Sequence, residues 1–313
     1  MQTVLITGGT GLVGKALTKQ LQARGYEVMV LTRKLPTNDP LIKNGISYAE
    51  WDIHKQTIDI AVVQKADYII HLAGAGVVDK KWTDAYKKEI QDSRTKSSEL
   101  IIDTLKNNSN KVKAIVSASA IGWYGPDKVP VKAFVETDAP DNSFLGETCR
   151  LWEESIDPVQ QLGKRLVKLR TGIVLSNDGG ALAEFKKPLK FCVASILGTG
   201  KQVVSWIHID DLCKLYIDAI ENNNLHGSYN AVAPIPVTNK ELTVTLAKEV
   251  RGNFFISAHV PEFILKIMLG DRSIEVLKSA TVSCEKIKQT GFAFLYPSIE
   301  MALKQLVNKD NKK

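Results

Sequence analysis

Three glycines near the start of the chain have the spacing of a loop that binds a pyrophosphate. Gly8, Gly11 and Gly14 follow an apolar strand-like run and lead into an amphipathic helical pattern. Gly8 permits a tight turn, Gly11 lets the backbone approach a phosphate, and Gly14 lets the helix pack against the strand. The helix N-terminus offers free N–H groups to the anion. We expect a bound dinucleotide rather than a purely structural turn, with contacts from Gly8, Thr10, Gly11, Leu12, Val13 and Gly14.

The end of the second predicted strand indicates which dinucleotide binds. A site for NAD usually has Asp or Glu about twenty residues after the glycines, to bind the ribose 2′-hydroxyl. Here the strand ends in Thr32 and Arg33, and the next acidic residue is Asp39. A guanidinium matches the geometry of a 2′-phosphate and can stack on adenine. The pair predicts NADP(H); the alternative is an ordinary surface arginine.

Further candidate residues follow the later strands. Asp52 can accept a hydrogen bond from the adenine amino group or cap a turn, and the sequence leaves both open. The small residues of the segment 72–74 (Leu72, Ala73 and Gly74) let the backbone pass beside a ribose and nicotinamide. Ser119 could hydrogen-bond a substrate carbonyl or alcohol. Tyr124 could be a general acid or only a packing aromatic, so both are candidate catalytic residues.

The composition is that of an ordinary globular protein. The 313 residues are 44% hydrophobic and 24% charged, which is enough for a sizeable core. We find no apolar run of membrane-spanning length and no signal peptide, because the first strand starts at residue 2. The four cysteines are widely separated, which predicts neither a disulfide framework nor a metal site and fits a reducing cytoplasm.

The net charge of +7 has two interpretations. The basic residues either form a lysine-rich solvated surface or attract anionic ligands such as nucleotides. We favour the first for most lysines, because they form no long stripe with interleaved aromatic residues. We therefore expect a small-molecule substrate, and neither a nucleic acid nor a membrane as partner.

Strand-like runs alternate with helical patterns through the first half of the chain. The expected strands are 2–7, 26–32, 47–51, 67–72, 112–119 and 166–170, and the expected helices are 12–24, 57–65, 83–107 and 145–162. Such alternation predicts parallel strands with helices on both faces. The expected fold is α/β, a Rossmann-type doubly wound parallel sheet with a smaller C-terminal substrate lobe.

The character of the sequence changes after residue 171. Loops rich in Gly and Pro separate short strands at 202–207 and 228–231 from helices at 210–222 and 238–251. We expect residues 1–170 to form an NADP-binding Rossmann domain. Residues 171–307 are expected to form the smaller lobe, with a C-terminal helical module at about 250–300. Some segments of 171–240 are expected to return to the Rossmann domain.

These motifs together resemble the extended short-chain dehydrogenase/reductases, and among them an atypical nucleotide-sugar epimerase-like group, the SDR39U1-type family. The resemblance covers nearly the whole chain and includes the segments 7–14, 71–74, 82–94, 117–125, 169–175, 206–212, 229–234 and about 250–300. It implies that Thr32 and Arg33 contact the adenosine phosphate of NADP(H) and that Leu72 and Ala73 line the ribose. It also implies that Glu89, Arg94 and Val174 lie near the cofactor. Judged by helical spacing alone, Glu89 and Arg94 look like solvated residues.

The chain departs from this superfamily where its proton donor is expected. Extended members use a Tyr-x-x-x-Lys pair, in which Lys lowers the pKa of the tyrosine and holds the nicotinamide ribose. When the sequence is aligned on Trp152, the tyrosine position falls at Phe144 or Leu145 and the lysine position at Thr148 or Cys149. None of these residues can replace the pair.

Two hypotheses about function follow. In the first, Tyr124, Ser119 or Glu147 supplies the proton, and the chain is an NADP-dependent oxidoreductase or epimerase for a small polar substrate such as a nucleotide sugar. Arg150 could replace the charge of the lysine. In the second, the chain is a catalytically weak NADP(H)-binding regulatory or structural protein. We favour the enzyme. The helices at 83–107 and 145–162 often pair between subunits in this superfamily, so a homodimer is one expected state.

Overall fold

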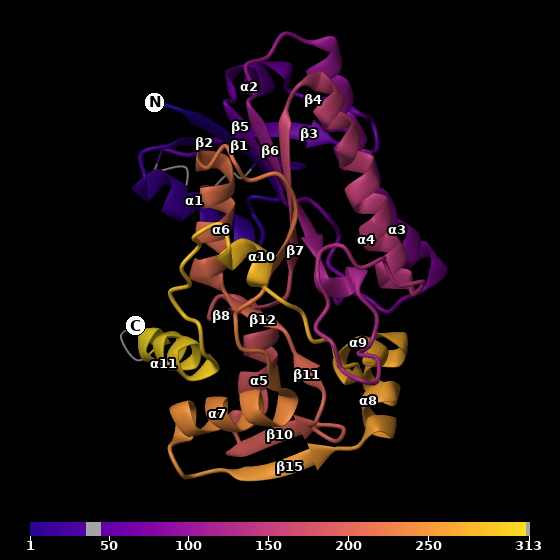
Figure 1. The fold of residues 1–313 in the computed structure, drawn as a ribbon, viewed down its shortest axis with the longest axis vertical. Coiled ribbons are helices and arrows are strands. Elements are labelled where there is room, and N and C mark those ends of the chain that lie inside the picture. Colours follow the sequence, from indigo (N-terminus) through magenta and orange to yellow (C-terminus); the bar gives the residue numbers. More distant parts are fainter. Residues whose placement is uncertain (36–44, 311–313) are drawn as a thin grey trace.

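The computed structural model describes residues 1–35 and 45–310. Its main sheet contains eight strands in the order β13-β7-β6-β5-β1-β2-β3-β4 (Figure 1). The pairs from β13 to β3 are parallel, and β4 runs antiparallel to β3 at one edge. The strands are β1 (Thr3–Thr7), β2 (Glu27–Thr32), β3 (Ser47–Asp52), β4 (Thr57–Ile58), β5 (Tyr68–His71), β6 (Ala114–Ala120), β7 (Arg165–Thr171) and β13 (Gly227–Ala231). The α/β class and the doubly wound parallel sheet are confirmed.

The chain order of the strands reverses at β1. β2 pairs with one side of β1 and β5 with the other, so the connections leave the sheet in opposite directions. In such sheets the ligand binds outside the carboxyl ends of the strands at this reversal. The segments that follow β1, β2 and β5 therefore meet at the expected binding crevice.

Alternating side chains bury both faces of the sheet. On β1, Val4 and Ile6 belong to one core cluster, and Leu5 belongs to a second cluster on the opposite face. Helices α1 (Leu12–Ala23) and α6 (Ile209–Glu221) cover the first face. The second face is covered by α2 (Ile60–Lys65), α3 (Asp84–Asn107) and α4 (Phe144–Ile156). Strands buried on both faces explain why the sequence shows continuous apolar runs.

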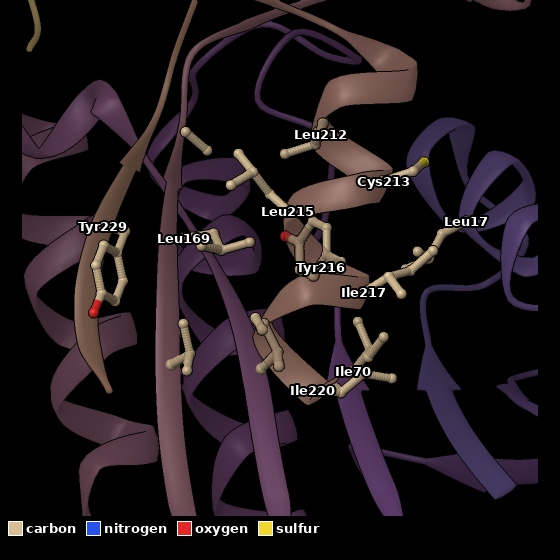
Figure 2. Packing of buried hydrophobic residues seen from close by; sticks show 14 of the residues in the cluster. Leu17, Ile70, Leu169, Leu212, Cys213, Leu215, Tyr216, Ile217, Ile220 and Tyr229 are labelled. Carbon is tan, nitrogen blue, oxygen red and sulfur yellow. The ribbon is translucent and has the colours of Figure 1, made fainter. Parts of the chain in front are cut away.

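Helix α6 comes from the second half of the chain but packs on the main sheet. Figure 2 shows Leu212, Leu215, Tyr216, Ile217 and Ile220 of this helix directed towards the strands, near Ile70 of β5 and Leu169 of β7. Helix α6 and strand β13 therefore place residues 209–231 in the main-sheet domain, although they follow residue 171 in the sequence. The domain boundary near residue 170 stays a prediction.

Most of the remaining elements form a smaller lobe below the carboxyl ends of the strands (Figure 1). Its apolar core joins side chains of α5 (Ala181–Leu189), α7 (Asn239–Arg251) and α11 (Ile299–Asp310). β10 (Val193–Leu197) pairs in parallel with β15 (Ile256–Val260). The other pairings join β11 (Val203–Val204) to β14 (Val237–Thr238), and β8 (Ile173–Ser176) to both β9 (Gly179–Gly180) and β12 (Trp206–His208). Shorter helices of the lobe are α8 (Glu262–Leu269) and α9 (Ser273–Leu277), whereas α10 (Glu285–Lys288) packs on the main sheet through Ile287.

Three predicted elements were wrong in their bounds. The helix predicted at 57–65 is strand β4 followed by α2, because the Asp59 side chain accepts a hydrogen bond from Ala61 N and starts the helix there. The helix predicted at 145–162 ends at Ile156, and a 3₁₀ segment containing Pro158 follows. The strand predicted at 202–207 is divided at Ser205, whose hydroxyl bonds the backbone of Ala280 and Val282. The region 250–300 also contains strand β15.

Within the described ranges, every helix is too short or too polar to cross a bilayer. Over the same residues, His, Cys, Asp and Glu side chains form no group of three that could hold a metal ion.

Candidate functional site

The glycine turn brings the ends of β1 and β5 into backbone contact. Gly8 has φ +69°, and a Cβ on this residue would lie 2.8 Å from the carbonyl carbon of Leu72. A Cβ on Gly14 would lie 2.7 Å from the carbonyl carbon of Gly9, inside the same turn. Both positions therefore exclude any larger residue, for a conformational reason at Gly8 and a packing reason at Gly14.

Helix α1 begins without a side-chain cap. Gly11 occupies the N-cap position in an extended conformation, and among the described residues no side-chain cap accepts a hydrogen bond from the first turn. Thr10 and Gly11 are exposed, while Leu12 and Val13 are half-buried. Side chains usually satisfy such N–H groups, so an uncapped, glycine-lined helix start is suited to bind an anion.

Thr7 and His71 hold the two loops of the crevice in place. Thr7 Oγ1 accepts hydrogen bonds from the backbone N–H groups of Leu72 and Ala73, each at 3.1 Å. The same oxygen lies 2.7 Å from His71 Nδ1. Burial, with a smaller effect from the Arg94 cation, lowers the pKa of His71 to about 3, so the ring is neutral. The neutral His71 ring therefore helps to hold Thr7 Oγ1 against the backbone of Leu72 and Ala73 without adding a charge to the crevice.

Arg94 lies beneath the loop that follows β5. Its Nη1 donates to the carbonyl oxygens of Ala75 at 3.1 Å and Ile90 at 2.8 Å, and its guanidinium stacks 4.8 Å from the centre of the Trp152 ring. A Cβ on Gly74 would lie 3.0 Å from Arg94 Cζ. Burial lowers the pKa of Arg94. The helical-spacing interpretation of Arg94 as a solvated residue is therefore wrong.

Glu89 is placed differently from Arg94. It is on the exposed side of α3 and pairs with Lys80 at 3.0 Å. Arg94 therefore lies against Gly74, whereas Glu89 lies near neither Arg94 nor Gly74. A role for Glu89 at the cofactor stays a prediction.

The end of β2 lies next to the glycine turn. Leu31 pairs with Thr7, so Thr32 and Arg33 extend beyond β1 at the same edge of the sheet. The Thr32 hydroxyl donates to Lys34 O. Arg33 is exposed, and its guanidinium makes no ion pair with the part of the chain that the structure describes. Asp39 lies outside the described residues.

Asp52 caps a turn at the end of β3. Its Oδ1 accepts hydrogen bonds from the N–H groups of His54 at 2.9 Å and Lys55 at 3.2 Å. These bonds lower the pKa of the carboxyl. The sequence left two roles open for Asp52, and these contacts show that it caps a turn. A hydrogen bond from Asp52 to adenine stays a prediction.

Val174 connects the smaller lobe with the crevice. It lies on β8 opposite Ile207, and packs on the same core cluster as Val13 and Leu72. A Cβ on Gly180, in the adjacent strand, would lie 3.1 Å from Leu12 Cδ2 and 3.9 Å from Val174 O. The β8-β9 hairpin therefore lies against the start of α1.

Helix α4 has no acid or base in the place of the usual Tyr-Lys pair. The Phe144 ring packs edge-on against Trp82 at 5.0 Å, and the Thr148 hydroxyl donates back to Phe144 O. Cys149 is buried; burial, partly offset by Arg94, raises the pKa of its thiol to about 12. These positions provide apolar and neutral surface.

Two other residues considered for catalysis bond to each other on the same helix. Arg150 Nε donates to Glu147 Oε2 at 2.8 Å, and its other nitrogens bind Glu147 and Glu154 at 2.5 Å. This arrangement does not support Arg150 as a substitute for the lysine. The hydrogen bond from Arg150 also lowers the pKa of Glu147, which disfavours Glu147 as a proton donor.

Ser119 and Tyr124 are buried in a polar network and do not face an open cleft. Ser119 Oγ donates to Glu153 Oε1 at 2.7 Å. The Tyr124 hydroxyl donates to Asn230 Oδ1 at 2.8 Å and accepts from Arg170 Nη1 at 3.0 Å. Burial raises the pKa of Tyr124 to about 12, although Arg170 and Asn230 oppose this shift. Both hydroxyls connect buried elements, and a catalytic role for Ser119 or Tyr124 stays a prediction.

The centre of this network is an ion pair that the sequence analysis did not identify. Arg170 Nε lies 2.7 Å from Glu153 Oε1, and both side chains are almost completely buried. The guanidinium also stacks 3.6 Å from the centre of the Trp123 ring. The sequence did contain one indication of this pair, because Arg170 lies within the largely apolar strand 166–171. A charged side chain in a buried strand needs a buried partner.

The sequence of this chain matches known protein families. The NAD dependent epimerase/dehydratase family model matches residues 4–145, and a domain model of unknown function, DUF1731, matches residues 260–306. The Epimerase family protein SAR0825 of Staphylococcus aureus (strain MRSA252) is 36% identical over 310 residues, which covers 99% of this chain and 100% of that protein.

Solved structures also resemble the whole chain. Human epimerase family protein SDR39U1 (isoform 2), solved with NADPH, has a TM-score of 0.85 and 28% identity, with 98% of this chain and 99% of that chain covered. A nucleoside-diphosphate sugar epimerase from Corynebacterium glutamicum has a TM-score of 0.76 and 31% identity, with 98% of this chain and 58% of that chain covered. The chain therefore belongs to the epimerase family, an atypical epimerase-like group of the short-chain dehydrogenase/reductases.

Proposed function

We propose that this protein binds NADP(H) across the carboxyl ends of β1, β2 and β5. The observation that carries the proposal is the uncapped start of α1, lined by Gly8, Gly11 and Gly14, with Arg33 exposed at the end of the adjacent strand. The glycine cradle would be filled by a Cβ at Gly8 or Gly14, so the residues present fit a pyrophosphate. NADPH in the human relative supports the same cofactor here.

Arg33 is proposed to select the phosphorylated form of the dinucleotide. The R33A variant should bind NADPH about tenfold to a hundredfold more weakly and NADH almost unchanged, because a charge-assisted pair with a phosphate contributes about 1.5–3 kcal/mol. Fluorescence titration of both cofactors measures this ratio. Lys34 is the matched control, since K34A removes the adjacent basic side chain. Retained NADPH preference in R33A would contradict the assignment.

Arg94 is proposed to supply the cation that the usual lysine provides. Its positive charge acts on the thiol of Cys149, one of the two candidate lysine positions, and its guanidinium lies against Gly74 in the loop after β5. It comes from α3 instead of α4, but it reaches the same end of the sheet. We infer that Arg94 orders the backbone at 74–75 beside the nicotinamide ribose and adds positive charge there.

The R94M variant is expected to weaken NADPH binding by about tenfold while leaving the protein folded. Methionine can occupy apolar space beside Trp152, and Arg94 has no carboxylate partner among the described residues, so no opposite charge is left unpaired. The control is R150M on the outer side of α4, which should bind NADPH like the wild type. Calorimetric titration with a parallel thermal melt separates lost affinity from lost structure. Equal effects of the two substitutions would refute the role of Arg94.

We propose that the reaction is oxidoreduction or epimerisation of a small polar substrate, with a nucleotide sugar as the first candidate class. The bound nicotinamide would exchange hydride with a substrate carbon. The Corynebacterium relative, a nucleoside-diphosphate sugar epimerase by description, supports this class. Phe144 and Thr148 occupy the positions of the usual pair and provide no acid, so the proton that accompanies the hydride would exchange with water, and the chain's own contribution is to position the substrate.

A catalytically weak NADP(H)-binding regulatory protein is the second candidate. Its specific support is α4, where Cys149 is buried with a raised pKa and no tyrosine is present. NADPH oxidation and product formation with a panel of UDP-sugars distinguish the two. Turnover of one compound supports the enzyme; saturable binding without turnover of any compound supports the regulatory protein. The homodimer stays a prediction.

A further inference from the structure

Helix α8 turns an apolar face towards solvent. Leu265 packs inward, whereas Phe263 and Ile267 are 63% and 77% exposed. Residues four apart lie on one side of a helix, and residue 265 is about half a turn from both. The two side chains therefore project from the side of α8 opposite its buried side. Met268 is also exposed.

Two neighbouring loops add further apolar side chains beside this helix. Arg272 Nη1, just after α8, donates to the carbonyl oxygen of Val78 at 2.6 Å, and the Val78 side chain is exposed. The segment after α9 binds the loop 126–132, because Asp127 hydrogen-bonds the backbone of Ser279 and the Thr281 hydroxyl. That loop passes beside α9 in Figure 1. Its Val129 is 95% exposed, and Val131 is also exposed.

We name the six side chains Val78, Val129, Val131, Phe263, Ile267 and Met268 the α8 surface. They come from three segments that hydrogen bonds of Arg272 and Asp127 hold near α8 and α9. Scattered exposed apolar residues are ordinary, but a group of this size on adjacent segments marks an interaction site.

Basic side chains accompany the α8 surface. Lys128 and Lys132 flank the two valines of the loop, Lys266 lies on α8, and Lys81 follows Val78; all four are exposed. Several nearby acids are already paired: Asp271 lies 3.8 Å from Lys87, and Glu275 lies 2.7 Å from Lys278. Two exposed acids, Asp79 directly after Val78 and Glu262 at the start of α8, offset two of these four lysines, so a smaller positive excess remains.

We propose that the α8 surface docks the protein on an anionic lipid bilayer, with the apolar tips in the interface and the lysines at the headgroups. This goes beyond the proposed function and departs from the expectation of no membrane partner. A second copy of the chain would bring the same positively charged surface against itself in a two-fold contact, and the repulsion of like charges is unfavourable. In protein–protein interfaces, anchor side chains are buried in well-packed pockets of the partner. The exposed apolar side chains of the α8 surface are better suited to insertion among lipid headgroups.

Vesicle co-sedimentation tests the proposal with the full chain and no nucleotide, so its outcome is independent of cofactor binding. Vesicles of phosphatidylcholine with phosphatidylglycerol should bind the wild type at least fivefold more than vesicles of phosphatidylcholine alone. The F263S/I267S variant should lose at least fivefold of that binding, and K128Q/K132Q should lose the preference for the anionic lipid. High salt should reduce binding by the wild type.

The matched control is F191S/F254S, which removes two comparably exposed phenylalanines next to α5 and α7, away from the α8 surface. It should bind vesicles like the wild type. The proposal is overturned if the wild type does not sediment with the anionic vesicles, or if both double serine variants lose binding equally. It is also overturned if F263S/I267S abolishes self-association in size-exclusion chromatography while vesicle binding is absent, since that result assigns the surface to a second copy.

Discussion

Alanine at Gly14 is expected to destabilise the protein by about 2 kcal/mol and to reduce NADPH binding by more than tenfold. Inside an ordinary helix, glycine to alanine stabilises by about 1 kcal/mol, so propensity predicts the opposite sign. Here the added Cβ would lie 2.7 Å from the carbonyl carbon of Gly9 and also contact Gly8 O. Overpacking against backbone costs about 3 kcal/mol and therefore outweighs propensity.

The measurement is urea unfolding of the G14A variant with NADPH titration on the same preparation. Lys15 gives the control, because it is the next residue of α1 and is exposed. The K15A variant should unfold within about 0.5 kcal/mol of the wild type. A stabilised G14A protein with normal NADPH affinity would show that α1 does not need this close approach.

Methionine at Arg170 is expected to destabilise the protein by about 3–5 kcal/mol, because it leaves the Glu153 carboxylate buried beside Ser119 and Lys168 without its main partner. Adding Glu153→Leu should recover at least about half of this loss, since the double variant buries no unpaired carboxylate. Chemical unfolding of the two single variants and the double variant forms the cycle. A double variant as unstable as the sum of both single variants would argue that the ion pair has no special role.

The effect of R170M should also depend on pH. Burial opposes ionisation of Glu153, but the hydrogen bond and charge of Arg170 prevail and hold the pKa of its carboxyl below the ordinary value. In the wild type this stabilisation is present above the unfolded-state pKa of about 4.3 and is lost as the pH falls through the lower folded-state pKa. Without Arg170, burial dominates and the pKa rises, so the folded state takes up a proton more readily. The stability difference between wild type and R170M should therefore shrink from about pH 8 to about pH 5; a difference that grows would contradict this account.

The sequence was sufficient for the main sheet and the glycine turn because their signals are local. Strands such as β1 and β5 are continuous apolar runs, and the turn at 7–14 combines glycines with a following helix. The lobe was harder to predict. β10 and β15 are short and lie far apart in the sequence, and β15 is largely exposed, so no alternating pattern marks their parallel pairing.

The buried surroundings of Tyr124 and Arg94 could not be predicted from the sequence for a related reason. Tyr124 follows a strand that ends at the crevice, but Phe134 stacks on it at 5.0 Å and Asn230 binds its hydroxyl from more than a hundred residues away. Arg94 looked solvated because its aromatic partner, Trp152, lies on another helix. Burial of a polar side chain depends on such distant partners, which a single sequence does not identify.

The most direct test of the account is equilibrium titration of the purified wild-type protein with NADPH and, separately, with NADH. An uncapped α1 beside Arg33 predicts saturable binding of NADPH with at least about tenfold preference over NADH. Equal affinity for the two cofactors would contradict the role of Arg33. Absence of saturable binding of either would contradict the central claim that the glycine turn holds a dinucleotide.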